Sequence, residues 1–329
     1  MEGGIKMCPQ KDKMSQTETS PMRQKEQVIV ICGPTASGKT GLSIELAKKI
    51  NGEIVSADSM QIYKDMNIGT AKPTPEEMQG IKHYLIDFIS PNERYSVADY
   101  KKDAKKAIKE IIDKGKTPIV VGGTGLYVDS LIYEIEYPEI EFDEQYRKEL
   151  EKIVDEKGLE YVYERAKEID LQAIEKISKN DAKRILRILE IYHATGKNKT
   201  EQEIESRKKE VEYDYKVYAI NWDRETLYER INKRVDNMIE QGLIEEVEKI
   251  SKKYNKFPTA MQGLGYKEVV EYLKGNCTKE EMIEKIKKET RHYAKRQLTW
   301  FRKNKQTIWL DGEKLTEYNV NLICSDCNI

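Results

Sequence analysis

The fold of this chain is decided by the stretch Gly33-Pro34-Thr35-Ala36-Ser37-Gly38-Lys39-Thr40, which matches the pattern G-x-x-x-x-G-K-[ST]. Before it, residues 27–32 (QVIVIC) form a continuous apolar run, which is typical of a buried parallel strand. After it, apolar residues recur at helical spacing up to residues 51–52. Because the glycines let backbone N–H groups turn onto an anion, and the helix directs its positive end there, this stretch predicts a phosphate site.

Two side chains complete this phosphate loop, the name used below for residues 33–40. Lys39 supplies a positive charge, and Thr40 offers a hydroxyl group to Mg²⁺. We therefore expect the loop to bind a di- or triphosphate with Mg²⁺ as cofactor, as nucleotide-binding and ATP-binding proteins do.

The acidic residue that usually holds the metal in such sites is missing from its expected place. The apolar run 118–121 ends in residues 122–125, which read GGTG. Asp58 follows the apolar run 54–57 and is the remaining candidate. Either Asp58 organises the metal, or the site needs a carboxylate for other work.

Strand-like and helix-like segments alternate along most of the chain. Strands are predicted at residues 53–58, 116–122, 215–220 and 307–310, and helices at 97–114 and from Asp223 onward. This alternation predicts an α/β fold, a P-loop NTPase-like parallel sheet flanked by helices. The predicted parts are a disordered extension (1–26), a catalytic core (27–137 and 215–312), a mostly helical insertion domain (138–214) and a tail (313–329).

Composition excludes several classes of protein. Lys and Arg number 57 against 58 Asp and Glu, so the chain is not uniformly basic. No apolar run approaches the roughly 20 residues that a bilayer requires, and the N-terminus lacks an apolar signal segment. We therefore expect a cytoplasmic protein with no membrane partner and no obligate protein partner, by default a monomer. The pair Cys324 and Cys327 lacks the second pair that a zinc site needs.

Seven motifs occur in order along the chain: GPTASGKT (33–40), SADSMQIYKDMNIGTAKPT (56–74), VVGGTGLYVDSL (120–131), NDAKRILRILE (180–190), WDR (222–224), AMQGLGYKE (260–268) and TRHYAKRQLTWFRKN (290–304). Together they resemble the motifs of the tRNA dimethylallyltransferases, or isopentenyl-tRNA transferases. The resemblance extends over residues 28–310, nearly all of the predicted folded region.

The resemblance implies a prenyl transfer. N6 of the adenosine immediately 3′ of the anticodon (position 37), in tRNAs reading codons that begin with U, would attack C1 of dimethylallyl diphosphate. The products would be N6-(dimethylallyl)adenosine and diphosphate. The phosphate loop would then cradle a leaving group, because the bond that breaks is carbon–oxygen. The residues alone leave a P-loop small-molecule or nucleotide kinase as the alternative.

The same resemblance implies roles at the reacting centre. Asp58 would orient N6 and accept its proton. The adenine must leave the stacked anticodon loop, and the residues beside Asp58 would line its pocket: Ser59, Met60 and Gln61. Thr124 would lie beside the adenosine or the diphosphate. Arg224 would contact the pyrophosphate, although the residues alone indicate a surface arginine at the start of a helix.

Two segments are predicted to bind the tRNA anticodon stem-loop. Residues 285–305 carry nine Lys and Arg against one acid, Glu289. In this segment the resemblance points to Arg296, Gln297 and Trp300. In the insertion domain it points to Lys183, Arg184, Ile185, Leu186 and Arg187, with Arg147 as a weaker candidate. The chain would then carry two separate cationic surfaces although its net charge is close to zero.

Overall fold

The structure, a computed structural model, describes residues 25–137, 143–206 and 210–329. The extension expected at residues 1–26 therefore lies, apart from its last two residues, outside the described residues. In the described part of the chain, no helix is long and apolar enough to cross a membrane.

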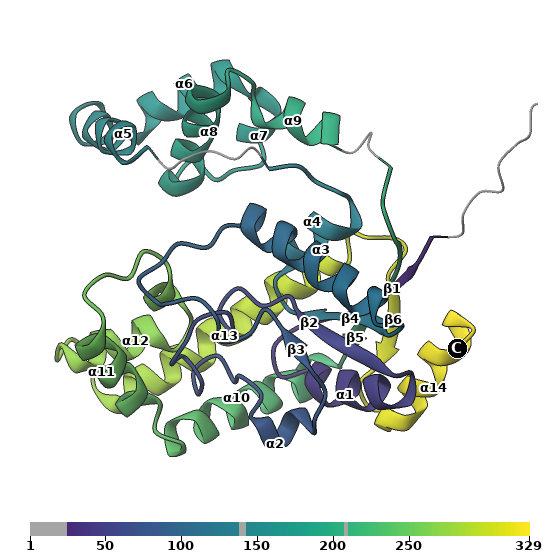
Figure 1. Cartoon of the computed structure of the whole chain (residues 1–329). Helices are drawn as coiled ribbons and strands as arrows, with labels where there is room; N and C mark the ends of the chain where they lie inside the picture. The colour runs from purple at the N-terminus through teal and green to yellow at the C-terminus, as the bar shows by residue number, and fades with distance from the viewer. Residues whose placement is uncertain (1–24, 138–142, 207–209) are drawn as a thin grey trace, which may run out of the picture.

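One parallel sheet organises the core (Figure 1). Its strand order is β3-β2-β4-β1-β5-β6. The strands are β1 (Gln27–Cys32), β2 (Gly52–Ser56), β3 (His83–Tyr84), β4 (Thr117–Gly122), β5 (Asp214–Asn221) and β6 (Ile308–Asp311). Every pairing is parallel, which confirms the predicted α/β class. The short strand β3 is absent from the sequence prediction, because two residues carry no periodic signal.

Helices cover both faces of the sheet, as the alternation of segments predicts. Alternate residues of β1 enter two different apolar clusters, since successive side chains of a strand point to opposite faces. Helices α3 (Val97–Asp113) and α4 (Gly125–Ile132) cover one face, and α1 (Lys39–Lys49) and α14 (Thr316–Cys327) cover the other. The central strand is therefore fully buried and fixes where the phosphate loop leaves the sheet.

Helix α14 replaces the tail expected at residues 313–329. Its buried residues Val320, Ile323, Cys324 and Cys327 follow the i, i+3, i+4, i+7 spacing of an amphipathic helix and pack in the same cluster as α1. The expectation of a tail was wrong because this spacing is short and sits in an otherwise polar segment. Both cysteines serve packing, and the described residues contain no group of three or more potential metal-binding side chains.

The insertion contains helices with an apolar core of their own. They are α5 (Glu144–Lys157), α6 (Leu159–Ile169), α7 (Leu171–Ile174), α8 (Ala182–Thr195) and α9 (Lys199–Ser206). Figure 1 shows them as a separate group beyond α4. Two chain segments connect the insertion to the core, and both lie against α3. There Lys105 of α3 forms ion pairs with Glu134 at 3.2 Å and with Glu212 at 2.6 Å. One lysine thus holds the outgoing and the returning chain together.

The remaining helices form a layer beside the carboxyl edge of the sheet. They are α10 (Arg224–Glu240), α11 (Leu243–Lys253), α12 (Tyr266–Leu273) and α13 (Lys279–Phe301), with the short α2 (Pro75–Met78) and η1 (Ala260–Gln262). Their apolar side chains pack against Ile62, Tyr63 and Met66. Helix α13 runs across the ends of the strands in Figure 1 and so lies over the predicted site.

Candidate active site

The carboxyl ends of β1, β2 and β4 bring the separate sequence motifs together. The phosphate loop follows β1, Asp58 follows β2, and Thr124 follows β4. The backbone N–H of Ser59 donates to Oγ1 of Thr124 at 3.0 Å, and the N–H of Thr124 donates to the carbonyl of Ala57 at 3.1 Å. Ligands of parallel sheets usually bind at this edge. These three predicted catalytic segments therefore form one site.

The phosphate loop has the backbone shape that an anion requires. Gly38 adopts a φ of 93°, which L side chains rarely tolerate, and helix α1 begins directly after it. The ammonium of Lys39 donates to the carbonyl of Pro34 at 2.7 Å, across the mouth of the loop. The hydroxyl of Ser37 is buried and has no partner within the described residues. A buried donor without a partner fits a loop whose ligand completes its hydrogen bonds.

Three side chains from distant segments hold residues 35–37 of the loop in place. Gln297 accepts from the N–H of Thr35 at 2.9 Å. Arg230 donates to the carbonyl of Ala36 at 2.9 Å, and the indole of Trp222 donates to the carbonyl of Ser37 at 3.0 Å. Helices α10 and α13 therefore fix the loop before any ligand binds.

An arginine that the sequence analysis missed belongs to the phosphate site. Burial, together with the positive charge of Arg234, lowers the pKa of Lys39 to about 8, while the charge of Asp58 acts in the opposite direction. Burial also lowers the pKa of Arg234, which Asp58 again opposes. Lys39, Arg234 and Asp58 therefore interact electrostatically in one site. Two cations close together are unfavourable without an anion between them.

Arg224 lies elsewhere. It is exposed at the start of α10, and its Nε donates to the hydroxyl of Tyr228 at 3.3 Å. Ten residues of helix place Arg234 about 15 Å further along the axis, beyond the turn where Arg230 contacts the loop. Arg234, and not Arg224, is therefore the arginine of α10 whose charge acts on Lys39. The spacing of four between Arg230 and Arg234, on one helix face, was the available sequence signal.

Asp58 closes a tight turn and keeps one oxygen available. Its Oδ1 accepts from the N–H groups of Met60 at 2.9 Å and Gln61 at 3.3 Å. Its Oδ2 has no hydrogen-bond partner in the described part of the chain. The amide nitrogen of Gln61 donates to the carbonyls of Thr70 at 3.3 Å and Ala71 at 3.2 Å. Ser59 and Met60 are half-buried beside Asp58.

Tyr293 is a second residue that the sequence analysis did not single out. Burial, with a smaller contribution from the charge of Asp58, raises the pKa of Tyr293 to about 12. Hydrogen bonding with Thr124 and Gln297 partly offsets this rise. Its hydroxyl therefore stays protonated near Asp58 and Thr124.

Of the three tRNA contacts expected in α13, one is contradicted by burial. Gln297 is buried, and its Nε2 donates to the carbonyl of Gly123 at 2.8 Å. A Cβ on Gly123 would lie 2.3 Å from that nitrogen, so any other residue here would displace the amide of Gln297. Trp300 is half-buried and donates to Asp129 at 2.9 Å. Arg296 is exposed, as a nucleic-acid contact requires.

The insertion also divides its predicted residues into two groups. Ile185 and Leu186 are buried in the core of the insertion, so their expected contact with tRNA is corrected. Arg147 pairs with Glu190 at 2.9 Å and with Glu151, which gives it a structural partner. The exposed cations of α8 are Lys183, Arg184 and Arg187. Of these, Arg184 lies 3.4 Å from Asp181 and Arg187 lies 3.2 Å from Glu190, whereas Lys183 has no acidic partner in the described residues.

A parallel sheet with a phosphate loop after β1, together with a carboxylate that follows β2 at the same carboxyl edge, defines a P-loop protein with a site for a phosphorylated substrate. The sequence model of the family described as IPP transferase matches residues 61–304. The chain belongs to this family.

Relatives with the same architecture support this assignment. A tRNA dimethylallyltransferase of Acetivibrio thermocellus is 53% identical over 88% of this chain and 93% of its own length. One from Bacillus cereus is 48% identical over 89% and 93%. The crystal structure of a full-length tRNA isopentenylpyrophosphate transferase from Bacillus halodurans has a TM-score of 0.69 and 41% identity, covering 92% of this chain and 96% of that one. A eukaryotic dimethylallyltransferase acting on tRNA has a TM-score of 0.75 and 31% identity, with 92% and 77% covered.

Proposed function

We propose that this enzyme transfers a dimethylallyl group from dimethylallyl diphosphate to N6 of the adenosine immediately 3′ of the anticodon, releasing diphosphate. The grouping of Lys39, Arg234 and Asp58 at the edge of the sheet is the observation that carries the proposal. A phosphate loop supplies the cations, and a carboxylate supplies a proton acceptor. The family assignment supports the same reaction.

The leaving group defines the task of the phosphate loop. Negative charge develops on the diphosphate as the bond from C1 to oxygen breaks. Lys39, Arg234 and the amides of the loop stabilise this charge more in the transition state than in the ground state. Trp222, Arg230 and Gln297 form hydrogen bonds with the backbone of the loop. These bonds keep the donors in position, so little reorganisation accompanies the reaction.

The carboxylate of Asp58 serves the attacking amine. The exocyclic amine loses a proton as its bond to C1 forms, and Oδ2 of Asp58 accepts that proton. The hydroxyls of Thr124 and Tyr293 lie near the carboxylate of Asp58 and position the flipped adenine beside it.

Mg²⁺ fits this donor set as a partner of the diphosphate. Thr40 is exposed beside the loop, and no acidic cluster is present in the described residues to hold the ion alone. Bound by the hydroxyl of Thr40 and phosphate oxygens, Mg²⁺ would neutralise charge on the leaving group. The exposed cations of α8 and Arg296 would bind the backbone of the anticodon stem-loop. We also propose a cytoplasmic monomer.

The test is an incubation of the protein with Mg²⁺, dimethylallyl diphosphate and unmodified tRNA, followed by mass analysis of the nucleosides. We expect N6-(dimethylallyl)adenosine only when both substrates are present, and only in tRNAs that read codons beginning with U. A parallel reaction with ATP and small-molecule acceptors tests the kinase alternative. Consumption of ATP without prenylated adenosine would overturn the proposal.

A further inference from the structure

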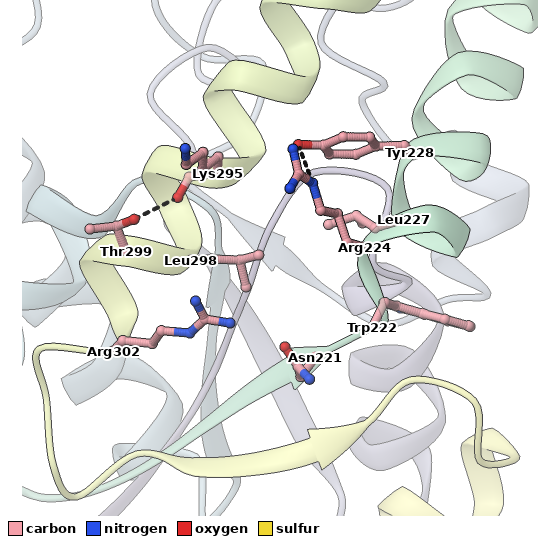
Figure 2. A pocket seen from close by; sticks show the side chains of 9 residues that line it. All are labelled: Asn221, Trp222, Arg224, Leu227, Tyr228, Lys295, Leu298, Thr299 and Arg302. Carbon is pink, nitrogen blue, oxygen red and sulfur yellow. Dashed lines mark hydrogen bonds between the residues drawn. The ribbon is translucent and has the colours of Figure 1, made fainter.

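A second pocket lies on the carboxyl edge of the sheet, next to the end of β5. It encloses about 310 Å³ between the start of α10 and the last turns of α13 (Figure 2). Arg224 projects from α10, and Lys295 and Arg302 project from α13. Arg224, which the sequence analysis assigned to the diphosphate, therefore lines this pocket.

Helix α13 separates this pocket from the catalytic site. Residues 293, 297 and 300 follow the i, i+4, i+7 spacing of one helix face, and they contact the site beside β4. Residues 295, 299 and 302 have the same spacing on another face, and all three line the second pocket. The cationic segment 285–305 therefore presents two different surfaces.

The three cations of the pocket lack carboxylate partners within the described ranges. Arg224 interacts with the hydroxyl and ring of Tyr228, and Arg302 lies 6.0 Å from the ring centroid of Trp309. The nearby carboxylate of Asp223 accepts from the N–H groups of Glu225 and Thr226, so it is used at the helix start. Unpaired cations around a cavity favour an anion as ligand.

The pocket also adjoins the back of the phosphate loop. Trp222 and Leu298 line it and pack in one cluster with Ala36 of the loop. The indole of Trp222 donates to the carbonyl of Ser37 of the loop at 3.0 Å. A ligand in the pocket would therefore touch a residue that holds the loop.

We propose that this pocket is a second phosphate-binding site, distinct from the phosphate loop, in which Arg224, Lys295 and Arg302 bind a phosphate or diphosphate group. The guanidinium groups of Arg224 and Arg302 can each donate two hydrogen bonds to phosphate oxygens. Two sources share this chemistry, a free phosphate compound and a backbone phosphate of bound tRNA.

The first experiment counts sites by calorimetric titration of the full-length protein with inorganic diphosphate. We expect two sites in the wild type, of which Lys39→Ala removes one and Arg224→Gln with Arg302→Gln removes the other. The double substitution should weaken the second site at least tenfold. As a charge-matched control, Lys249→Gln with Lys252→Gln removes two exposed cations of α11 and should keep both sites. Unchanged unfolding temperatures would show that the variants fold.

Two results would overturn the proposal. One is a single site that Lys39→Ala abolishes. The other is equal weakening by the control variant, which would indicate a general charge effect.

A second experiment identifies the source in the Lys39→Ala protein, where only the pocket remains. Saturating anticodon stem-loop RNA displaces diphosphate from the pocket if a backbone phosphate is the natural ligand. If RNA and diphosphate bind together without competition, the pocket belongs to a free phosphate compound. Arg224→Gln with Arg302→Gln should weaken RNA binding in the first case and leave it unchanged in the second.

Discussion

The side-chain oxygen of Gln297 accepts a hydrogen bond of 2.9 Å from the backbone N–H of Thr35, a residue 262 positions earlier in the chain. The nitrogen of the same amide donates to the carbonyl of Gly123 at 2.8 Å. One buried side chain of α13 therefore joins the phosphate loop to the turn that carries Thr124. The geometry of the diphosphate site depends on this amide.

Gln297→Glu should therefore impair binding of dimethylallyl diphosphate. The carboxylate still accepts from Thr35, but it repels the carbonyl of Gly123, and an unsatisfied buried group costs about 1–3 kcal/mol. We expect the KM for dimethylallyl diphosphate to rise about tenfold or more, with little change in tRNA affinity. Steady-state kinetics and a tRNA binding assay measure the two effects.

His292→Gln, at an exposed position of α13, is the control and should leave both values unchanged. If Gln297 contacts tRNA directly, the opposite result follows, a loss of tRNA affinity at constant KM for the diphosphate.

The substitution Asp58→Asn tests the proton transfer by Asp58 separately from its structural role in the turn. The amide oxygen can still accept from Met60 and Gln61, but the side chain no longer accepts a proton from the amine. General-base catalysis contributes roughly 10²- to 10⁴-fold, so we expect kcat to fall by that range while the dissociation constant of tRNA stays constant. Single-turnover prenylation is the measurement. A variant with near wild-type turnover would exclude Asp58 as the base.

The affinity for dimethylallyl diphosphate should decrease as the pH rises through about 8. Burial lowers the pKa of Lys39 to about 8 in the free enzyme, so the ammonium is charged below that pH and neutral above it. The charged form binds the diphosphate, and hence KM should rise above pH 8. In Lys39→Arg the charge persists to much higher pH. The rise of KM above pH 8 should then disappear in this variant, whatever its absolute activity. If KM still rises near pH 8 in Lys39→Arg, the titrating group is a residue other than Lys39.

Arg234→Gln should lower kcat/KM for dimethylallyl diphosphate by about 10²- to 10³-fold, the usual effect of removing one donor from a charge-stabilising site. Lys233→Gln removes an exposed cation from the neighbouring position of α10 and serves as the control. Competitive inhibition by inorganic diphosphate should weaken in parallel with the Arg234 substitution only. Equal effects of both substitutions would point to net charge and not to a specific contact.

Binding of tRNA should become less dependent on salt when the exposed cations of α8 are removed. Each phosphate contact contributes close to one unit to the slope of log K against log salt concentration. Lys183→Gln with Arg184→Gln should therefore reduce the slope by up to about two. Lys152→Gln, an exposed cation of α5 paired with Glu156, should change it little. An unchanged slope in the α8 variant would place the tRNA on another surface.

Much of the core could be predicted from the sequence because its signals are local. The apolar run of β1, the glycines of the loop and the helical spacing of α1 lie within two dozen residues. Asp58 was found for a related reason, since it follows a predicted strand, whereas the role of Thr124 was implied by the family resemblance. The carboxyl ends of parallel strands meet at one edge, so order along the chain already implied proximity.

Long-range packing decided the rest. The choice between Arg224 and Arg234 depends on which turn of α10 reaches the phosphate loop, and a charge pattern alone does not reveal this. Gln297 and Trp300 stand in a basic segment that looks like a nucleic-acid surface, yet α13 turns them toward the strand ends. Residues 316–327, which were expected to belong to a tail, form helix α14 because their apolar side chains pack with those of α1.

The sequence by itself thus determined the α/β class, the phosphate loop and the family of reaction, because these follow from contiguous motifs. Only the tertiary structure decided which arginine joins Lys39, which residues of α13 hold the loop, and which cations remain free around the second pocket. Those assignments depend on the rotation of α10 and α13 about their axes. That rotation is set by the apolar contacts of Leu227, Ile231 and Ala294 with Ala36.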